Sequence, residues 1–271
     1  MRGDIATSWG NSQPQHSLLL SKMSGISKGN DRFNAEAAAW DSNPSVHLAS
    51  SLALKSILEH HPELTTSNDT DVLEIGCGTG LLSLSLAPHV RSLTAVDAAQ
   101  GMIDAFNVKL GKRPEVRNVI PVCAMLEDPD DTRIRLDPLN KDQREGLPAR
   151  RFDLIISHLV LHHIPSLEDM FKTMHGCLKK GGRVALTDFE DFGPGARKFH
   201  PEAKMEGVER HGIPRRGVKN LLEDAGFVDV KIETAFEMEK WVEASPGDGV
   251  IKGEGGSKMR FPFLICMGRK E

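Results

Sequence analysis

The sequence predicts an α/β protein built on a doubly wound, mostly parallel sheet of seven strands, and three observations predict it. Short apolar segments alternate with helix-like segments from residue 71 to residue 187, which is typical of parallel strands joined by helices. The first apolar segment runs into a glycine turn at Gly76, Gly78 and Gly80, as in a strand leading to a ligand-facing helix. Two longer strand-like segments end the chain, and their adjacency predicts an antiparallel pair.

Two helices are expected ahead of the first strand. Residues 35–40 and 46–60 have helical character, and Asn43-Pro44 separates them. Proline is favoured in the first turn of a helix, so Pro44 is expected to begin the second one. Apolar residues recur along one side of that helix, which predicts that it packs against the rest of the protein.

The elements of the predicted sheet follow in order. The expected strands are residues 71–75, 92–97, 119–124, 152–157, 183–187, 228–237 and 261–267. The expected helices begin at Leu81 and cover residues 100–110, 167–178 and 217–224. Residues 179–182, Lys-Lys-Gly-Gly, are expected to form a turn before the fifth strand, and a glycine-rich stretch, 245–257, joins the last two strands. Residues 127–151 are rich in charged side chains and proline, which predicts a surface excursion.

One domain, residues 33–271, is expected behind a tail. Residues 1–32 are rich in Ser, Gly, Asn and Gln without a sustained apolar period, a composition typical of disordered segments. A chain of 271 residues accommodates one α/β domain with additions. Within it we expect a core over residues 71–187 and a glycine- and proline-containing loop over residues 192–214.

The composition argues against several classes of protein. The chain is 39% hydrophobic and 27% charged, with a net charge of −4 at pH 7, so it lacks the basic excess of nucleic-acid-binding proteins. No apolar run approaches the ~18 residues of a membrane span. The four cysteines are scattered, without the paired spacing of a zinc site. They fit a reducing compartment, and we expect a cytoplasmic protein. Nothing in the sequence indicates an oligomeric state.

The register of the glycine turn distinguishes between classes of nucleotide cofactor. Residues 72–80 read Val-Leu-Glu-Ile-Gly-Cys-Gly-Thr-Gly, whereas the dinucleotide fingerprint requires a third glycine one place later, where this chain has Leu81. Asp97 ends the second expected strand, 17 residues after Gly80. Further along the chain stand residues 152–164, with the run Ser-His-Leu-Val-Leu-His-His-Ile, and the Lys-Lys-Gly-Gly turn.

These four segments, in this order, resemble the motifs of the class I S-adenosylmethionine-dependent methyltransferases. The resemblance covers roughly residues 33–270. It implies the Rossmann-like methyltransferase fold, S-adenosyl-L-methionine as the cofactor and methyl transfer as the reaction. It also implies that residues 33–62 form a helical cap over the cofactor.

The resemblance assigns cofactor-binding roles by position. Glu74 is expected to hold the methionine ammonium group, and Asp97 to accept hydrogen bonds from both ribose hydroxyls, as an acid at that place does in this fold class. Met102 is expected beside the adenine, and either Glu127 or Asp128 beside its amino group. The full cofactor-binding set is Trp40, Glu74, Gly76, Cys77, Gly78, Gly80, Asp97, Ala98, Met102, Met125, Leu126, Glu127, Ser157 and His158.

Several of these assignments have a structural alternative. Asp97 can instead cap the following helix, and Met102 can be a core residue at helical spacing. Trp40 can likewise be core, although an aromatic ring beside a sulfonium gains about 0.5–2 kcal/mol by cation–π attraction.

Five histidines are candidate general bases. A reference pKa of ~6.5 lets an imidazole accept a proton near neutrality, and a positioned base typically adds about 10²–10⁴-fold to a rate. The alternative is that the His-His-Ile segment only orients its loop, and that the two later histidines cap a helix or lie in solvent. The transfer itself requires no metal ion, and none is expected. The candidates are His158, His162, His163, His200 and His211.

The predicted function is methyl transfer to an oxygen, nitrogen or sulfur atom of a small molecule. It rests on a compact single domain with a cap and without a basic or peptide-docking appendage. We expect neither nucleic acid nor membrane as a partner. Two alternatives remain. One is a catalytically silent methyltransferase-like protein that binds the cofactor, and the other is an NAD-dependent oxidoreductase, which Leu81 opposes.

Overall fold

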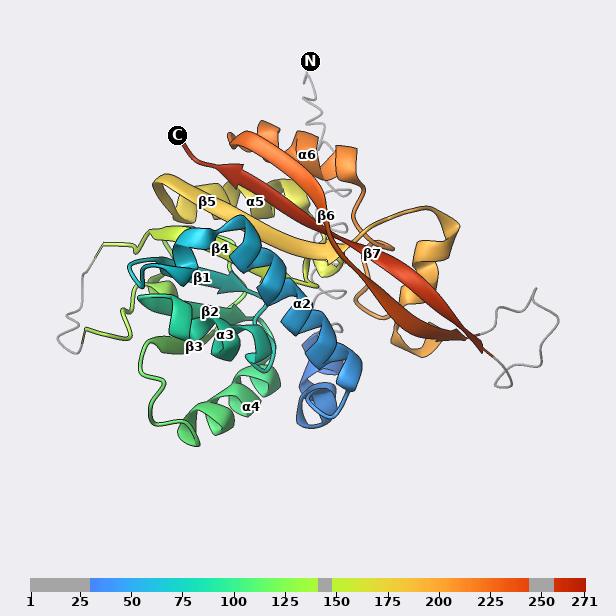
Figure 1. Cartoon of the computed structure of the whole chain (residues 1–271). Helices are drawn as coiled ribbons and strands as arrows, with labels where there is room; N and C mark the ends of the chain where they lie inside the picture. Colours follow the sequence, from blue (N-terminus) through green and yellow to red (C-terminus); the bar gives the residue numbers. More distant parts are fainter. Residues whose placement is uncertain (1–29, 141–147, 244–255) are drawn as a thin grey trace, which may run out of the picture.

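The computed structural model describes residues 30–140, 148–243 and 256–271. Within them, a seven-stranded sheet has the order β3-β2-β1-β4-β5-β7-β6 (Figure 1). The strands β1 to β5 are parallel, and β7 lies antiparallel between β5 and β6. The predicted doubly wound sheet with an antiparallel last pair is confirmed. The strands are β1 Asp71–Ile75, β2 Ser92–Asp97, β3 Val119–Cys123, β4 Phe152–His158, β5 Leu178–Phe189, β6 Val228–Glu243 and β7 Gly256–Arg269.

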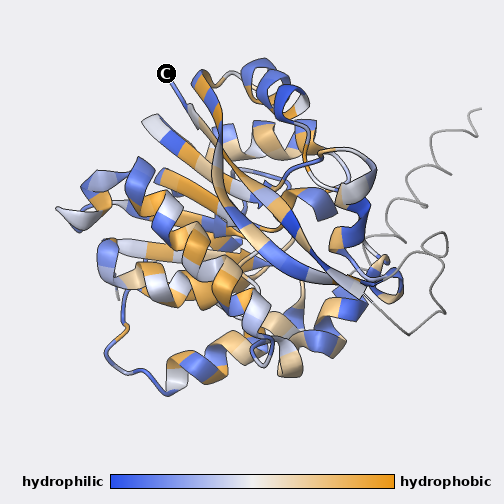
Figure 2. Ribbon diagram, turned by 45° about the vertical axis from the view of Figure 1, so that its right-hand side comes forward, coloured by the Kyte–Doolittle hydropathy of each residue, from blue (hydrophilic) through white to orange (hydrophobic). Residues whose placement is uncertain are grey.

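Helices cover both faces of the sheet, and hydrophobic residues are frequent along the strands and the helices (Figure 2). Apolar side chains fill the two layers between the sheet and its helices. Neighbouring residues of β1 serve opposite layers, as the alternation of a strand requires. Val72 packs in the layer beneath α2, α3 and α4, and Leu73 in the layer beneath α5 and α6. The helices are α2 Pro44–His60, α3 Leu81–Leu86, α4 Gln100–Gly111, α5 Leu167–Cys177 and α6 Arg215–Asp224. The 3₁₀ turns are η1 Pro62–Thr65, η2 Ala87–His89, η3 Thr132–Ile134, η4 Leu161–His163, η5 Pro194–Phe199 and η6 Glu202–Lys204.

The strand order reverses between β1 and β4. From β1 the chain builds outward to β2 and β3, and then returns to pair β4 with β1 on its other side. In open α/β sheets, ligands bind outside the carboxyl ends of the strands at such a reversal. The glycine turn after β1, Asp97 at the end of β2 and η4 after β4 all lie at this edge.

The bounds of β1 and β2 agree with the sequence, but β5 is longer than predicted. It begins at Leu178 instead of Arg183. The residues predicted as a turn, 179–182, continue the strand through a register irregularity opposite Phe152 and Leu154 of β4. The prediction of a separate turn was therefore wrong, because Gly181 and Gly182 lie within β5, at the irregularity in its pairing with β4.

β6 and β7 also exceed their predicted lengths. β7 pairs with β5 only from Phe263 to Arg269, whereas it pairs with β6 as far as Gly256. The outer half of this pair extends past the rest of the sheet (Figure 1). There it packs against the segment that carries η5, through an apolar cluster that includes Phe199 and Phe261.

Residues 30–40 are helical, so the helix includes residues 30–32 as well as the first part of the predicted cap. Pro44 begins α2 as expected, and the Asn43 side chain accepts a hydrogen bond from the Ser45 amide at 3.0 Å. The tail prediction for residues 1–29 lies outside the described residues, as does most of the predicted glycine-rich connection. None of the helices in the described ranges combines the length and apolar character needed to cross a membrane.

Candidate functional site

The glycine turn is fixed by backbone hydrogen bonds to β2. The amides of Gly76 and Cys77 both donate to the carbonyl of Val96, at 2.8 and 3.0 Å. The φ angles of Gly76, Gly78 and Gly80 are +74°, +53° and +81°, which glycine adopts without steric cost. The turn therefore needs glycine at the three positions predicted from the sequence.

The three glycines differ in the space around them. A Cβ on Gly76 would stand 2.2 Å from the Val160 side chain, and one on Gly80 would stand 2.4 Å from the Phe106 ring. A Cβ on Gly78 would meet nothing within 4 Å. The first and third glycines thus allow close packing, whereas the open space above Gly78 fits a cofactor that approaches the backbone.

Asp97 holds this turn from the end of β2. Its Oδ2 accepts a hydrogen bond from the Gly78 amide and its Oδ1 from the Ala99 amide, both at 2.8 Å. Burial raises the pKa of Asp97, and the amide donors partly offset that effect. Ala99 is the N-cap residue of α4, and that helix has no side-chain cap, so the bond from the Ala99 amide to Asp97 links the end of β2 to the start of α4. Together the two bonds hold the carboxylate beside Gly78.

Glu74 is buried beneath the turn, with a relative exposure of 2%. Its Oε2 accepts a hydrogen bond from the Ser83 hydroxyl on α3. Burial raises the pKa of Glu74 to about 8, against the opposing effect of that hydrogen bond. The carboxyl group is therefore largely protonated at neutral pH until a cation reaches it.

The helical segment 30–40 and the residues after it are tied to the glycine turn. Asp41 Oδ1 accepts a hydrogen bond from the Thr79 hydroxyl at 2.6 Å, and its Oδ2 pairs with Lys109 Nζ at 2.6 Å. The Asn34 side chain accepts a hydrogen bond from the Gly101 amide at 2.7 Å. The predicted cap thus lies on the turn and on the start of α4. Asp41 was not predicted from the sequence, because its partners stand 38 and 68 positions away.

The cap also packs on the start of α4. Met102 is 2% exposed and lies in an apolar cluster with Ala37 and Ala99, against which Trp40 packs. Phe33 meets the Trp40 ring edge-on, with 5.9 Å between centroids. Both Met102 and Trp40 therefore contribute to the contact between the cap and α4, which is the packing role weighed for them above.

The residues expected around the adenine have different environments. Met125 is half-buried, Leu126 is 3% exposed within an apolar cluster, and Glu127 is exposed. Asp128 Oδ1 accepts a hydrogen bond from the Asp130 amide at 2.8 Å, which commits it to a local turn. Within the described residues, the Glu127 side chain makes no such hydrogen bond. Ala98 and Cys77 line the same edge, and burial raises the pKa of the Cys77 thiol.

The end of β4 leads into the histidine-rich loop. The buried Ser157 hydroxyl donates to the Ile75 carbonyl at 2.8 Å, which joins the ends of β4 and β1. His158 Nδ1 lies 2.9 Å from the Thr187 hydroxyl. Leu159 then adopts a φ of +57°, and this left-handed residue turns the chain into η4.

His162, His163 and His200 lie together, whereas His158 and His211 do not join them. Ring centroids are 3.9 Å apart for His162 and His163, and 5.0 Å for His162 and His200. His211 instead bonds Arg197 at 2.8 Å. The sequence analysis named all five residues without indicating which of them meet.

Burial changes the acid–base character of these histidines. It lowers the pKa of His158 to about 4, of His162 and His163 to about 3, and of His200 to about 2. A general base works best with a pKa near the operating pH. The premise of an ordinary histidine pKa was therefore wrong for these four rings, because each is desolvated and the clustered rings also feel nearby cations.

Comparisons with known proteins identify the family of the chain. Residues 37–232 match the methyltransferase domain family. The chain is 28% identical over 178 residues to an uncharacterized methyltransferase of Schizosaccharomyces pombe, covering 64% of this chain and 58% of that protein. It is 31% identical over 139 residues to the ubiquinone biosynthesis O-methyltransferase of Coxiella burnetii, covering 51% of this chain and 50% of that protein. The chain thus spans little more than half the length of these relatives.

The fold also has a solved counterpart. The N-methyltransferase NodS from Bradyrhizobium japonicum, in complex with S-adenosyl-L-homocysteine, superposes with a TM-score of 0.52. The match covers 90% of this chain and 98% of NodS at 16% sequence identity, and at that identity it concerns the fold.

Proposed function

Because the chain belongs to the family of S-adenosylmethionine-dependent methyltransferases, we propose that it transfers the methyl group of that cofactor to an oxygen, nitrogen or sulfur atom of a small molecule. The observation that carries the small-molecule class is a roof over the carboxyl ends of the strands. The cap forms one half of this roof, and residues 192–214 form the other.

Two contacts join the two halves of the roof, and a third joins the cap to η4 beside them. An Arg32 guanidinium nitrogen donates to the Lys204 carbonyl at 2.6 Å, and Lys204 Nζ pairs with Glu36 at 3.0 Å. Phe33 meets the His163 ring edge-on, with centroids 5.2 Å apart. An acceptor has to fit beneath these contacts, which favours a small molecule over a nucleic-acid duplex or a folded protein. The name of the Coxiella burnetii relative, an O-methyltransferase of ubiquinone biosynthesis, supports the same class.

Residues of the carboxyl edge fit the cofactor. Asp97 would accept the ribose hydroxyls, and Glu74 would meet the methionine ammonium group, directly or through a bridge. Gly78 leaves open space beside both. When bound, S-adenosylmethionine supplies an electrophilic methyl group on a sulfonium. We assign Met125 to the surroundings of the adenine and Trp40 to those of the sulfonium.

Positioning is the main contribution that we assign to the chain. Holding a nucleophile in line with the methyl group supplies roughly 7–11 kcal/mol through effective molarity. The neutral imidazole of His158 has a buried Nε2 without a partner in the described structure. It would orient an acceptor hydroxyl or amine as a hydrogen-bond acceptor, because its low pKa makes it a weak base.

A transfer assay with a deuterated methyl donor tests the proposal. The protein is incubated with phenols, amines and thiols, and in parallel with peptides and RNA, and mass spectrometry detects the labelled product. Labelling of a small molecule, lost in the Asp97→Ala variant, is expected. Labelling of the peptides or RNA alone would overturn the small-molecule class. Tight binding of S-adenosylhomocysteine without labelling of any acceptor would favour the catalytically silent alternative.

A further inference from the structure

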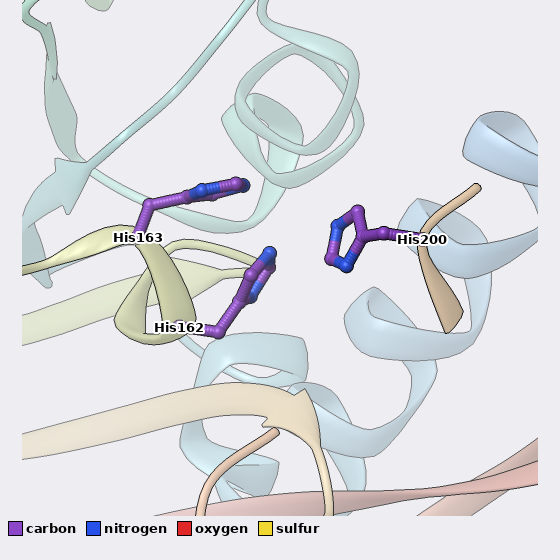
Figure 3. Close-up of side chains that lie close together, drawn as sticks. All are labelled: His162, His163 and His200. Atoms are coloured by element: carbon purple, nitrogen blue, oxygen red, sulfur yellow. The ribbon is translucent and has the colours of Figure 1, made fainter. Parts of the chain in front are cut away.

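Three histidine side chains converge from two separate segments of the chain. His162 and His163 stand on η4, and His200 follows η5. One ring nitrogen of each lies within 4.8 Å of the others, and Figure 3 shows the rings directed toward a common space. The cluster is the strongest grouping of potential metal ligands within residues 30–140, 148–243 and 256–271.

Hydrogen bonds behind two of the rings determine which nitrogen is available. His162 Nδ1 lies 2.8 Å from a carboxylate oxygen of Asp188, and its buried Nε2 has no partner in the described structure. His163 Nδ1 donates to the Gly207 carbonyl at 2.6 Å, which leaves Nε2 as its other nitrogen. Metal-binding histidines almost always donate their second ring N–H to a carboxylate or a carbonyl in this way.

We propose that His162, His163 and His200 bind a divalent transition-metal ion of the zinc class, with Asp188 as a positioning residue behind His162. Three imidazole nitrogens suit zinc, copper or nickel, whereas magnesium and calcium require oxygen ligands. Nitrogens bound tetrahedrally to zinc at about 2.0–2.1 Å lie roughly 3.3 Å apart. Binding therefore draws the three rings together by up to roughly 1.5 Å. His200 stands between two short 3₁₀ turns and is the ligand best placed to move.

The surrounding charges indicate what completes the site. Arg210, Arg32 and Lys240 act on His162 through their positive charges, so they oppose a bare dication. The same cations favour an ion that carries an anionic ligand in its fourth position. Hydroxide, a thiolate or a phenolate meets that requirement.

The site adjoins the expected methyl donor. The Val160 side chain fills the space next to Gly76, and η4 begins at the following residue. As an extension that rests on the proposed function, the fourth ligand is the acceptor atom itself, which would lose its proton to solvent and be held as an anion beside the methyl group. The bond from this atom to the methyl carbon would form as the bond from the sulfonium sulfur breaks, and S-adenosylhomocysteine would leave. The metal site does not depend on that extension, because the ion alone can be titrated.

Direct titration of the full chain tests the site. Metal is removed with a chelator, and Zn²⁺ binding is measured by calorimetry without cofactor or acceptor. Co²⁺ is added in parallel, because nitrogen ligation in a tetrahedral site gives visible absorption bands. One Zn²⁺ per chain is expected, with no competition from a large excess of Mg²⁺. Absence of Zn²⁺ binding, or Co²⁺ spectra like those of the free aqueous ion, would overturn the site.

Two variants assign the ligands. His200→Gln leaves the buried pair of His162 and Asp188 intact, so it should fold. It is expected to weaken Zn²⁺ by more than the roughly 10–100-fold that follows loss of a hydrogen-bond partner behind a ligand. His89→Gln, at a half-buried histidine on η2 at the opposite edge of the sheet, is the matched control and should bind as the unaltered protein does. Equal affinity in His200→Gln and His89→Gln would exclude the cluster as the binding site.

The acceptor extension has its own readout. With an acceptor identified by the transfer assay, the metal-free and Zn²⁺-loaded proteins are compared, and the acceptor is added to the Co²⁺ form. A shift of the Co²⁺ bands on adding a thiol or phenol acceptor, together with faster transfer, supports the extension. Unchanged bands and an unchanged rate, with Zn²⁺ still bound, remove the extension and leave the metal site in place. Failure to find any acceptor would count against the proposed function alone.

Discussion

Gly78 differs from the other two glycines of its turn in what an added methyl group would meet. An alanine there pays the left-handed backbone strain of about 1–2 kcal/mol without a clash. An alanine at Gly80 adds overpacking against the fully buried Phe106 ring, which typically costs 1–3 kcal/mol more.

The pair Gly78→Ala and Gly80→Ala therefore separates binding from packing. We expect Gly78→Ala to be the more stable variant but to lose about tenfold or more in cofactor affinity, or over 1.4 kcal/mol. Denaturant unfolding and calorimetry with S-adenosylhomocysteine measure the two quantities. Unaltered affinity in Gly78→Ala would show that the cofactor does not occupy the space above it.

Asp97 makes the second prediction at this scale. Asp97→Ala is expected to weaken cofactor binding, because hydrogen bonds to a charged acceptor contribute about 1.5–3 kcal/mol each. Calorimetry on the folded variant measures the loss. Asp104→Ala, an exposed acid on the same helix α4, is the control and should bind normally. A loss of equal size in both variants would contradict a specific role of Asp97.

Glu74 gives a pH dependence with a defined sign. Burial raises its pKa to about 8 in the folded protein, above the ordinary value of ~4.3 in the unfolded chain. Its stabilising contribution is complete below that unfolded pKa and is lost as the pH rises toward 8, by about 1.4 kcal/mol per pH unit.

Glu74→Gln removes this titration and keeps a hydrogen-bond acceptor for Ser83. Relative to the variant, the unaltered protein should become less stable by several kcal/mol between pH 5 and pH 8. Urea unfolding of both proteins across that range measures the difference in their free energies of unfolding. The contributions of other titrating groups are the same in both proteins and cancel in that difference. A difference that does not change with pH would mean that Glu74 titrates normally.

At the scale of the elements, a single residue after the helical segment 30–40 holds the cap to the glycine turn and to α4. Asp41 alone joins it to Thr79 and Lys109. Removing that charge weakens both contacts, so the cap should open more often. Hydrogen exchange measures such local opening.

We expect residues 33–50 to exchange more slowly when S-adenosylhomocysteine binds, and faster in Asp41→Asn than in the unaltered protein. Mass spectrometry of exchanged peptides measures both effects. Glu59→Gln, in an exposed ion pair with Lys55 on α2, should exchange normally. If cofactor leaves the exchange of residues 33–50 unchanged, the segment is not a cap.

The bounds of the strands show which elements could be predicted from the sequence. β1 and β2 were predicted to the residue, because turn residues bound each apolar run. β6 and β7 were predicted too short, because their outer halves are held by each other and alternate between polar and apolar side chains. Predicted pairing of distant strands requires information that a single run of residues does not contain.

The same limit applies to the site. The glycine turn and Asp97 were predictable because their order along the chain carries the information. The contacts of Asp41 with Thr79, and of His162 with His200 and Asp188, join residues 26 to 38 positions apart. Burial lowers the histidine pKa values, and burial is a property of the folded molecule. The sequence therefore predicted the histidines with the wrong acid strength.

At the scale of the whole molecule, the two edges of the parallel sheet differ in the residues that they carry. The amino-terminal edge carries an ionic network around Asp71, which is 5% exposed. Arg91, Arg150 and Lys179 surround it. Burial raises the pKa of Asp71, but the hydrogen bonds from its neighbours outweigh this and lower it to about 2. Residues of this edge lie at the other end of β1 from the glycine turn.

Asp71→Asn should therefore reduce stability without reducing cofactor affinity. Breaking a fully buried ion pair costs about 3–5 kcal/mol, and the loss here should be smaller. Arg91 and Lys179 are partly exposed and keep Asp137 and Asp153 as partners, so only Arg150 shares the burial of Asp71. Denaturant unfolding and calorimetry measure the two effects. Asp229→Asn, whose pair with Arg269 is exposed, should change stability by less than about 1 kcal/mol. Weaker cofactor binding in Asp71→Asn would show that the two edges are coupled.

The helical segment 30–40, with Asp41, contacts the glycine turn, and through Arg32 and Phe33 it also contacts residues 192–214 and the histidine loop. Under the proposed function, one element would cover both the donor and the acceptor sides. Its departure would open both at once, so the release of the methylated product and of the spent cofactor would share a single kinetic step. The residence time of the cap would then set how often a new cycle can begin.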